Sequence, residues 1–389
     1  MALRQVRHRT RRITTPVCAA AALAGVLGAA PPSRALPDRD GGVLLVRPGE
    51  SVQRAVDAAR PGDTVFLAPG VYRESVRIDK SHLMLRGSGR RTVLAPPATR
   101  AENACGQHGD GICVTAGAGG PLTDVHLRSL TVEGFRRNGV WASGTEGLTV
   151  HRVRARHNGQ WGIGLEKSVR SSVRDSDITD NGDAGVFVAN VVEEEGGALD
   201  TRGTLLVRNT LAGNRIGVTA RRVRNLLIGH NTVTGNCAGV FVVGDEGRPR
   251  AGALTVRDNE VARNNKFCPK TKRLPFLQGV GVVLTGTEDS LVQHNLVRDN
   301  TGTSPLSGGV VLFHSFVKAT NDRNLVRDNI VLRNAPADLI NADPDGRGNV
   351  FIRNTCRTSR PPGLCGDRAP QHRTPDHAKP PRNGRIEAE

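Results

Sequence analysis

The sequence predicts an all-β protein in which short strands stack coil upon coil into one solenoid. Three observations support this prediction. A Gly-apolar motif recurs along most of the chain, a second apolar strand motif begins shortly after it, and asparagines recur five residues apart between the two. Self-similarity with a period of roughly 20 to 50 residues is typical of solenoids.

Residues 1–35 precede the repeats and are predicted to be a signal peptide. They combine a basic start without acidic residues, an apolar run from Val17 to Ala30 and the small-residue pattern SRA ending at Ala35. The run is too short and alanine-rich for a membrane span, which needs about twenty apolar residues. TRRI, beginning at Thr10, resembles a twin-arginine motif, although arginine pairs are common in this chain. We expect a secreted mature protein without an integral membrane segment, and the twin-arginine route stays open.

A short helix is expected to close the N-terminal end of the solenoid. Ser51 is a suitable N-cap, and the Pro61-Gly62 pair ends the helical pattern. Such a helix covers apolar side chains that would otherwise meet water at the open end. The residues expected on its apolar face are Val52, Ala55, Val56 and Ala59.

The Gly-apolar motif supplies one strand to each coil. It begins at Gly139, Gly162, Gly185, Gly217, Gly239, Gly281 and Gly309. Side chains alternate between the two faces of a strand, so the first and third residues after each glycine point one way, and the second and fourth the other. The first set is uniformly apolar and is predicted to be the core. The second set is mixed and is predicted to face outward.

Two series of asparagines occupy the turns between strands. Asparagine side chains hydrogen-bond to like residues in neighbouring coils, and asparagine tolerates left-handed backbone. We therefore expect structural ladders. The first series is Asn209, Asn231, Asn259, Asn295, Asn329 and Asn354, and the second is Asn158, Asn181, Asn214, Asn236, Asn264, Asn300 and Asn334.

The repeat, NxVxxNxxxGVxV in outline, resembles the parallel β-helix repeat family over residues 43–355. This family includes pectate lyases, polygalacturonases, alginate-active enzymes and NosD-type periplasmic proteins. The resemblance implies a single right-handed parallel β-helix. It does not imply one activity, because the sequence contains none of the GHG, RxK, WxDH or DPHE segments of the family's enzymes.

The expected organisation is a signal peptide in residues 1–35, the β-helix in residues 36–365 and a disordered tail in residues 366–389. The tail is charged and rich in proline, with almost no apolar residues. Six cysteines remain after processing, an even number suited to an oxidising compartment. Metal binding by them is disfavoured, because no CxxC pair occurs. Three local disulfides are predicted: Cys105 with Cys113, Cys237 with Cys268, and Cys356 with Cys365.

The outward face of the Gly-apolar strands is the candidate site. Trp141, Phe187 and Phe241 occupy one outward column, where aromatic rings suit stacking against sugars, and Arg221 is placed to bind hydroxyls or a carboxylate. The alternative is that these aromatic residues pack beneath a long loop. Long insertions interrupt the repeats after Gly185 and Gly239, and insertions often build one binding face.

Two enzymatic chemistries are compatible with outward side chains. Proton removal beside a uronate carboxylate needs a base and a cation or arginine that neutralises the carboxylate. Hydrolysis instead needs paired carboxylates across a cleft. The candidates for the first chemistry are Lys167, Arg221, His314 and Lys318. The candidates for the second are Glu166, Asp183 and Asp245.

Metal sites are secondary hypotheses. An acidic insertion offers oxygen ligands to Ca²⁺, or is simply a solvated loop; its residues are Glu193, Glu194, Glu195 and Asp200, joined by Asp245 and Glu246. Histidines recur in the second strand type, but their registers differ, so a NosD-like copper site is disfavoured. The residues that precede the first asparagine series are read as a surface stack of mixed charges: Arg152, Asp175, Arg208, His230, Asp258, His294, Asp328 and Arg353.

The net charge of the mature chain indicates the class of molecule that it binds. Removal of residues 1–35, with six arginines and no acid, lowers the formal net charge from +17 to +11. A basic secreted protein suits an acidic polysaccharide or wall polymer, although composition bias explains an arginine excess equally well. Nucleic acid is disfavoured because no recognition motif accompanies the charge. We expect a monomer that acts on an acidic polysaccharide as a lyase or glycoside hydrolase; a non-catalytic wall- or carbohydrate-binding protein and a copper accessory protein are the alternatives.

Overall fold

The computed structural model describes residues 41–99, 103–117, 119–192 and 196–366. The predicted signal peptide and the tail from residue 367 lie outside these ranges, as do Glu193, Glu194 and Glu195. The described residues belong to one compact unit that begins at Asp40. No helix among them is long and apolar enough to cross a membrane.

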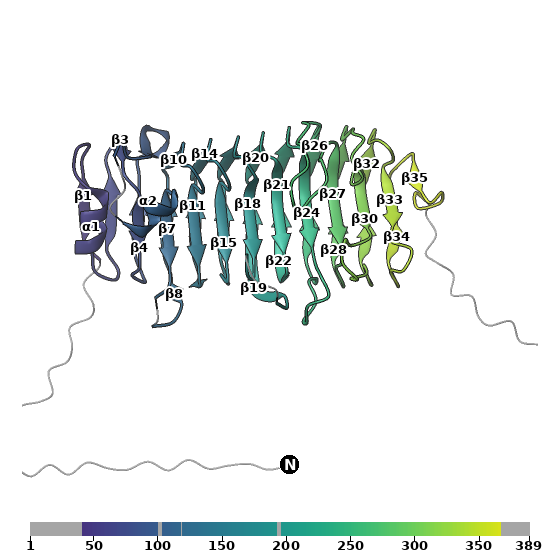
Figure 1. Cartoon of the computed structure of the whole chain (residues 1–389), viewed down its shortest axis with the longest axis horizontal. Coiled ribbons are helices and arrows are strands. Elements are labelled where there is room, and N and C mark those ends of the chain that lie inside the picture. Colours follow the sequence, from purple (N-terminus) through teal and green to yellow (C-terminus); the bar gives the residue numbers. More distant parts are fainter. Residues whose placement is uncertain (1–40, 100–102, 118, 193–195, 367–389) are drawn as a thin grey trace, which may run out of the picture. The chain divides into compact units, whose positions relative to one another are not determined.

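Three parallel sheets, named A, B and C, run along the described solenoid (Figure 1). Each repeating coil adds one strand to each sheet. Parallel strands joined by crossover connections coil to the right, as the sequence predicted. In stacking order, the strands of sheet A are β1 (Val43–Val46), β2 (Thr64–Leu67), β5 (Met84–Arg86), β9 (His126–Arg128), β13 (Thr149–His151), β16 (Ser172–Arg174), β19 (Leu199–Val207), β22 (Val223–Gly229), β25 (Thr255–Arg257), β28 (Leu291–Gln293), β31 (Leu325–Arg327) and β34 (Val350–Ile352).

Sheets B and C complete each coil. The strands of sheet B are β3 (Gly70–Arg73), β6 (Thr92–Ala95), β10 (Thr131–Glu133), β14 (Arg154–Arg156), β17 (Asp177–Thr179), β20 (Thr210–Ala212), β23 (Thr232–Thr234), β26 (Glu260–Ala262), β29 (Leu296–Arg298) and β32 (Ile330–Leu332). Those of sheet C are β4 (Val76–Ile78), β7 (Ile112–Thr115), β11 (Val140–Ser143), β15 (Ile163–Glu166), β18 (Ala184–Ala189), β21 (Ile216–Arg221), β24 (Ala238–Val243), β27 (Val280–Thr285), β30 (Gly308–Phe313), β33 (Leu339–Ala342) and β35 (Ser359–Arg360). A separate small pair consists of β8 (Leu122–Thr123) and β12 (Thr145–Glu146).

The predicted N-terminal helix is present as α1 (Val52–Ala58), beside β1 at the first coil (Figure 1). The Ser51 side chain caps it by accepting a hydrogen bond from the Arg54 amide at 3.2 Å. Val52 and Val56 are buried against the first coils, so the helix covers the apolar stack as expected. Two further short helices were not predicted: η1 (Gly89–Arg91) and α2 (Ala104–His108).

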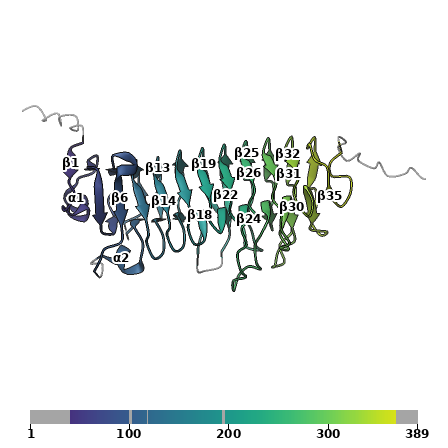
Figure 2. The same ribbon diagram turned by 90° about the horizontal axis from the view of Figure 1, so that it is seen from above.

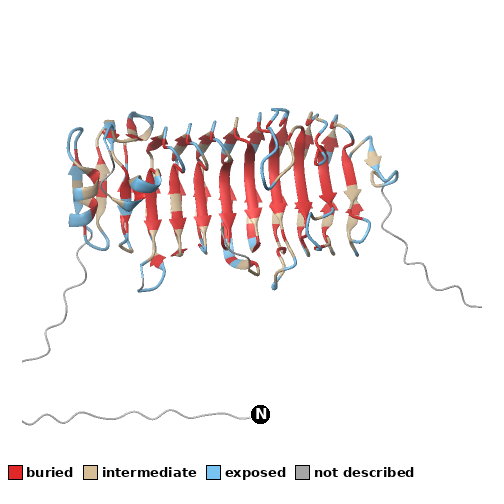
Figure 3. Ribbon diagram, in the orientation of Figure 1, coloured by how far each residue is buried: buried red, intermediate tan, exposed pale blue. Residues whose placement is uncertain are grey.

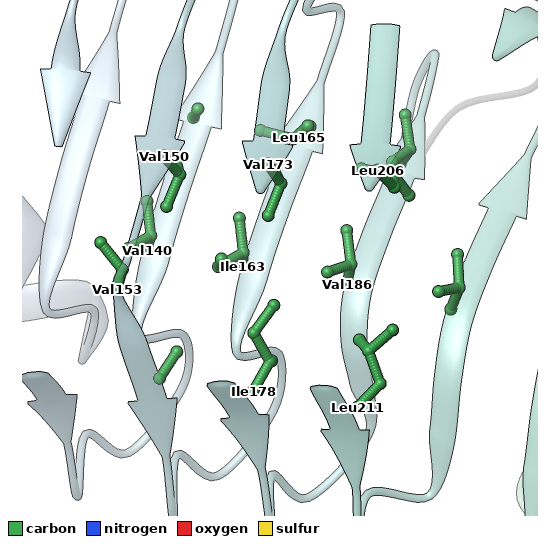
Figure 4. Packing of buried hydrophobic residues seen from close by; sticks show 14 of the residues in the cluster. Val140, Val150, Val153, Ile163, Leu165, Val173, Ile178, Val186, Leu206 and Leu211 are labelled. Carbon is green, nitrogen blue, oxygen red and sulfur yellow. The ribbon is translucent and has the colours of Figure 1, made fainter. Parts of the chain in front are cut away.

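The core follows the predicted alternation. The first residue after each motif glycine is buried inside the coil, as Val140, Ile163 and Val186 show. These side chains stack on their counterparts in adjacent coils (Figure 4), and buried positions continue through the strands of the solenoid (Figure 3). Valine, isoleucine and leucine fill the interior because β-branched and apolar side chains fit a pleated, buried surface.

The motif glycines are required by the close approach of the next coil. A Cβ atom on Gly217 would lie 2.5 Å from the Val233 side chain and 2.7 Å from the carbonyl oxygen of Gly239. The strand pairing passes over this glycine, because Ile216 and Val218 are paired with the neighbouring strand and Gly217 is not. The irregularity turns Ile216 toward the outer cluster and Val218 toward the core.

Both asparagine ladders are present. In the second, the Asn214 side-chain amide donates to the Asn236 carbonyl oxygen at 3.2 Å, and Asn236 donates to Asn264 at 2.8 Å. Each ladder amide also donates to a backbone carbonyl of a preceding coil, so the buried polar atoms are satisfied. The series ends on Asp338, which accepts from Asn334 at 3.1 Å. A carboxylate suits this end because only acceptors are needed there.

The ladder asparagines, although asparagine tolerates left-handed backbone, do not themselves adopt it. The left-handed residue is the one before each of them, such as Arg208 before Asn209 and Asp328 before Asn329. These corner side chains point outward and pair across coils: Arg208 with Asp175 at 2.7 Å, and Arg353 with Asp328 at 2.7 Å. The predicted surface stack of mixed charges is therefore confirmed for these pairs.

The corner pairs predict a loss of stability in acid. Hydrogen bonds from Arg353 hold the pKa of Asp328 below its usual value. A lowered carboxyl pKa contributes stability that is fully present above the unfolded value of about 3.9 and is lost as pH falls through the folded value. The Asp328→Asn variant should therefore be less stable than the native chain at neutral pH, and the difference should shrink below about pH 4. Denaturant titration at each pH measures this; a constant difference would contradict it.

All three predicted disulfides are present: Cys105–Cys113, Cys237–Cys268 and Cys356–Cys365. The first holds α2 beside β7, and the last closes the loop that follows β34 in the final coil. The middle one attaches the long segment between β26 and β27 to the coil that contains β24, because Cys237 directly precedes that strand.

Candidate functional site

A cleft of ≈ 970 Å³ lies on the outer face of sheet C, over β18, β21, β24 and β27. Its walls include side chains of Asp245–Gly247, Thr271–Leu274 and Ser315–Val317, which belong to the loops between coils. Figure 2 shows loops that project beyond the strands next to β24 and β30. The insertions identified in the sequence thus build one face of the solenoid, and the cleft lies beneath them.

Aromatic side chains form the floor and one wall of this cleft. Trp161 stacks on Phe187 with ring centroids 4.1 Å apart, and the Trp141 ring lies 5.5 Å from Trp161. Gly164, in the same outward column, makes room for both indoles: a Cβ there would lie 2.7 Å from Trp141 and 2.9 Å from Trp161. The three stacked rings therefore need a residue without a side chain beneath them.

The predicted aromatic column is outward-facing but largely covered. Phe187 and Phe241 line the cleft, yet only 6% and 3% of their surfaces are exposed. Trp141 is half-buried and is not among the residues that line the cleft. The expectation of an open stacking platform is therefore corrected. These rings pack on one another and beneath loop side chains, so their flat faces are not free to stack on a sugar ring.

Asp183 and Arg215 come from adjacent coils at the N-terminal end of sheet C. They precede the paired residues Ala184 and Ile216, and the Arg215 Nε atom lies 3.9 Å from an Asp183 carboxylate oxygen. The other carboxylate oxygen accepts a hydrogen bond from the Trp161 indole at 3.1 Å. The three side chains form one polar group at the wall of the cleft.

The environment of Asp183 shifts its titration. Although 41% of its side chain remains exposed, the surrounding protein desolvates the carboxyl and raises its pKa, against the opposing effects of the Trp161 hydrogen bond and Arg215. A carboxyl with a raised pKa exchanges protons closer to neutral pH than an ordinary aspartate, which is the property expected of an acid–base group.

Arg215 has unused hydrogen-bonding capacity. Its Nη1 atom donates to the Pro269 carbonyl oxygen at 2.9 Å, while its buried Nη2 atom has no hydrogen-bond partner among the described residues. The hydroxyl of Thr285, also in the cleft lining, is likewise buried without a partner there. Both atoms therefore keep hydrogen-bonding capacity that the described protein groups do not use.

The disulfide Cys237–Cys268 positions the wall that Arg215 contacts, because Pro269 follows Cys268 directly. Reduction, or the Cys268→Ser variant, should release this segment and remove the carbonyl that orients the guanidinium. We expect faster proteolytic cleavage after Lys270, Lys272 or Arg273, measured by mass spectrometry of trypsin-treated protein. Unchanged cleavage rates on reduction would show that the segment is held by other contacts.

A second charged group lies at the opposite end of the same strands. The Arg221 Nη1 atom donates to the Val192 carbonyl oxygen at 3.1 Å, and the Arg222 guanidinium binds the Asp245 carboxylate. All of these residues line the cleft. The predicted candidates Arg221, Asp183 and Asp245 are therefore gathered into one cleft, although they occupy its two ends.

The predicted pairing of carboxylates for hydrolysis is not found. Asp183 precedes β18 and Asp245 follows β24, and the six-residue length of these strands alone separates the two ends by about 17 Å. Catalytic carboxyl pairs in glycosidases lie roughly 5 to 10 Å apart. Glu166 lies outside the lining and is bonded to the Ser143 hydroxyl at 3.0 Å and the Val192 amide at 3.0 Å.

The predicted bases Lys167, His314 and Lys318 are also outside the cleft lining. Lys167 is an exposed left-handed corner residue, which turns its side chain away from the sheet face. His314 is exposed and stacks on Phe313 with centroids 4.2 Å apart. Strand-end position in the sequence therefore did not bring these three side chains to the site.

The metal hypotheses receive no support from the described ranges. No group of three or more histidine, cysteine or acidic side chains among those residues is placed to hold a metal ion. Three members of the acidic cluster proposed for Ca²⁺, Glu193, Glu194 and Glu195, lie outside the described residues. Among its other members, Asp245 is bound to Arg222.

Sequence reasoning missed Trp161, Arg215 and Thr285 as site residues. The signal for Thr285 was present, because it lies in the same outward column as Arg221. Arg215 follows a ladder asparagine directly and precedes the motif glycine by two residues, a position that the strand alternation did not cover. Only the pairing of adjacent coils places it beside Asp183.

The fold agrees with known proteins. Residues 101–252 match the family model described as right handed beta helix region. The chain is a right-handed parallel β-helix. The Azotobacter vinelandii mannuronan C-5 epimerase AlgE6 A-module is similar with a TM-score of 0.57 and 17% identity, covering 79% of this chain and 90% of that one. DFA-IIIase from Arthrobacter chlorophenolicus A6 in complex with GF2 is similar with a TM-score of 0.55 and 14% identity; the match covers 82% of this chain and 90% of that one. No curated protein matched the sequence.

Proposed function

We propose that this β-helix binds an acidic polysaccharide in the cleft on sheet C and acts on it, with Arg215 holding a uronate carboxylate. The observation that carries the proposal is the buried Arg215 guanidinium, which keeps one unpaired nitrogen beside the acid–base group Asp183. A planar guanidinium suits a carboxylate ligand.

Charge and shape support a polymeric, acidic ligand. Five basic and three acidic side chains line the cleft, with an aromatic and aliphatic floor between them. The cleft crosses four strands, about 14 Å at the spacing of neighbouring strands. This length accommodates more than one sugar ring, and the two charged ends allow contacts to successive units.

The chemistry that fits this arrangement is proton removal beside the carboxylate. Ionised Asp183 takes the proton from the carbon that bears the carboxylate, and Arg215 stabilises the charge that develops on the carboxylate oxygens. The electron pair then expels the glycosidic oxygen with formation of a carbon–carbon double bond, or accepts a proton from a water molecule on the opposite face, with inversion. The expelled oxygen takes its proton from Asp183 or water. Hydrolysis by Asp183 and Asp245 is disfavoured because these two carboxyl groups are too far apart.

Localisation outside the cytoplasm belongs to the same proposal. Three disulfides suit an oxidising compartment, where wall and matrix polysaccharides are found. The similar fold of a protein named mannuronan C-5 epimerase is compatible with a polyuronate ligand, at the level of fold alone.

A non-catalytic binding protein is the second candidate. It is favoured by the engagement of Asp183 with both Trp161 and Arg215, which gives this carboxyl a structural role without any reaction. The aromatic wall and Arg215 serve binding equally well. The two candidates share the ligand and differ only in turnover.

The test is incubation of the protein with alginate, polygalacturonate, a glycosaminoglycan and a neutral glycan, followed by assays for unsaturated products, new reducing ends and solvent deuterium incorporation. Unsaturated product or deuterium uptake on a uronate polymer, lost in Asp183→Asn, is the expected result. Retention on uronate polymers without turnover would select the binding protein. Equal behaviour toward neutral and acidic glycans would overturn the proposal.

A further inference from the structure

A second basic region lies on sheet A, which is a different face of the solenoid from the cleft. Strand pairing places Arg86, Arg128, His151 and Arg174 directly opposite one another on four consecutive coils. We call this column the basic ladder. Adjacent strands are about 4.8 Å apart, so the ladder extends about 14 Å along the stacking direction.

Few acidic groups compensate this column. Arg86 and Arg174 form no ion pair among the described residues. The Arg128 Nη2 atom lies 3.2 Å from the Nδ1 atom of His151. The carboxylate nearest His151 is Asp175, at 3.3 Å, and Arg208 already binds it with two hydrogen bonds. Burial and the flanking arginines lower the pKa of His151. The positive charge of the ladder is therefore carried by Arg86, Arg128 and Arg174, and His151 lies between the last two.

Further along the same column the pattern changes. Arg257 lies 2.6 Å from Asp258, and Arg327 lies 3.5 Å from Asp328. These arginines are on sheet A and in the same register column, but each forms an ion pair with the aspartate that follows it. Arg174 is also followed by an aspartate, Asp175, which instead pairs with Arg208 and His151. Like charges placed directly opposite on neighbouring strands destabilise a sheet. Packing thus gives no reason for the basic ladder, whereas an anionic ligand does.

A second cleft, of ≈ 670 Å³, lies at the corner between sheets A and B beside the ladder. Arg86 and Arg152 line it, and neither has an acidic partner among the described side chains. The Arg86 guanidinium is 5.7 Å from the centre of the Phe66 ring, which also lines the cleft. The hydroxyl of Thr131, 1% exposed and in the lining, has no hydrogen-bond partner in the described part of the chain. Two carboxylates, Asp175 and Asp177, also line the cleft, and both are ion-paired with arginines. The corner thus offers arginines without acidic partners, an aromatic ring and an unsatisfied hydroxyl together.

We infer that the basic ladder and its corner cleft form a second binding site for an acidic linear glycan, with the chain lying along the stacking direction. Arginines on three of the four coils match a polymer with anionic groups at regular intervals. Carboxylate and sulfate groups offer the same recognition chemistry. The site stands on observations separate from the cleft on sheet C, and a polymer held at both would gain avidity.

The experiment measures retention of the protein on immobilised alginate and heparin at increasing salt, in the Arg215→Gln background so that the first cleft does not contribute. The test variant carries Arg86→Gln and Arg174→Gln, and the charge-matched control carries Arg257→Gln and Arg327→Gln. We expect the test variant to lose affinity roughly tenfold, and the control to change less than twofold. Preference for alginate would assign carboxylates as the ligand, and preference for heparin would assign sulfates.

The melting temperature separates binding from folding. Removal of two charges from a column of like charges should leave the melting temperature of the test variant unchanged or raise it, so a loss of retention with intact stability supports the site. Equal losses in the test and control variants would overturn the inference, since net charge alone would then explain retention. Tighter binding to single-stranded DNA than to either glycan would overturn it as well.

Discussion

Replacement of Asn236 by alanine is expected to lower the free energy of unfolding by about 4 kcal/mol. Asn236 is fully buried. It accepts hydrogen bonds from the backbone and side-chain amides of Asn214, and it donates to Asn264 and to the Leu211 carbonyl oxygen. Alanine leaves two buried donors and a carbonyl without partners, and each such group costs about 1–3 kcal/mol.

The measurement is equilibrium unfolding in urea, with Asn225→Ala as the control. Asn225 is exposed and lies outside both ladders, so its loss should cost well under half as much. Because a solenoid is stabilised by nearest-neighbour contacts, the unfolding transition of Asn236→Ala should also broaden or split into two steps. A cost below about 1 kcal/mol would show that water replaces the side chain, and that the ladder is dispensable.

Replacement of Arg215 by glutamine is expected to weaken retention on uronate polymers by about 10- to 100-fold, the effect of losing one charge-assisted hydrogen-bonded pair. The unpaired guanidinium nitrogen in the cleft is removed, and the neutral amide no longer stabilises a carboxylate. The loss of the positive charge should also raise the pKa of Asp183 further, because Arg215 opposes its desolvation. Any acid–base profile of turnover should shift toward higher pH for the same reason.

Arg263→Gln is the charge-matched control, because Arg263 is an exposed left-handed corner residue outside the cleft. Its affinity should match that of the native chain within about twofold. Thermal unfolding of both variants shows whether the Arg215 change disturbs the wall at Pro269. If Arg215→Gln keeps native retention while remaining folded, a uronate carboxylate does not bind at this residue.

Most of the scaffold was predictable because its determinants repeat. Core residues such as Val186 and Val240, the glycines before them and the ladder asparagines recur in most of the coils, so each is identified by comparison with its counterparts. The disulfide pairing was predictable for a related reason, since cysteines that are close in sequence or one coil apart have few partners within reach. The capping helix followed from Ser51 and the apolar face behind it.

The backbone of the corners was predicted less well. Left-handed geometry falls on Arg208 or Asp328 and not on the asparagine that follows, because the asparagine side chain must point inward to reach the next coil. The preceding residue then makes the turn and points outward, where charged side chains are solvated and pair across coils. The sequence pattern contained both positions, but the tolerance of asparagine for left-handed backbone did not indicate which of them makes the turn.

The sequence by itself determined a right-handed stack of coils, its core, its ladders, its cap and its disulfides, since all of these depend on short-range or strictly periodic patterns. Only the tertiary structure decided the sites. Pairing of adjacent coils brings Arg215 beside Asp183, loop side chains cover Phe187 and Phe241, and the length of a strand separates Asp183 from Asp245. Charge neutralisation is likewise decided coil by coil, which is why Arg257 is paired and Arg86 is not.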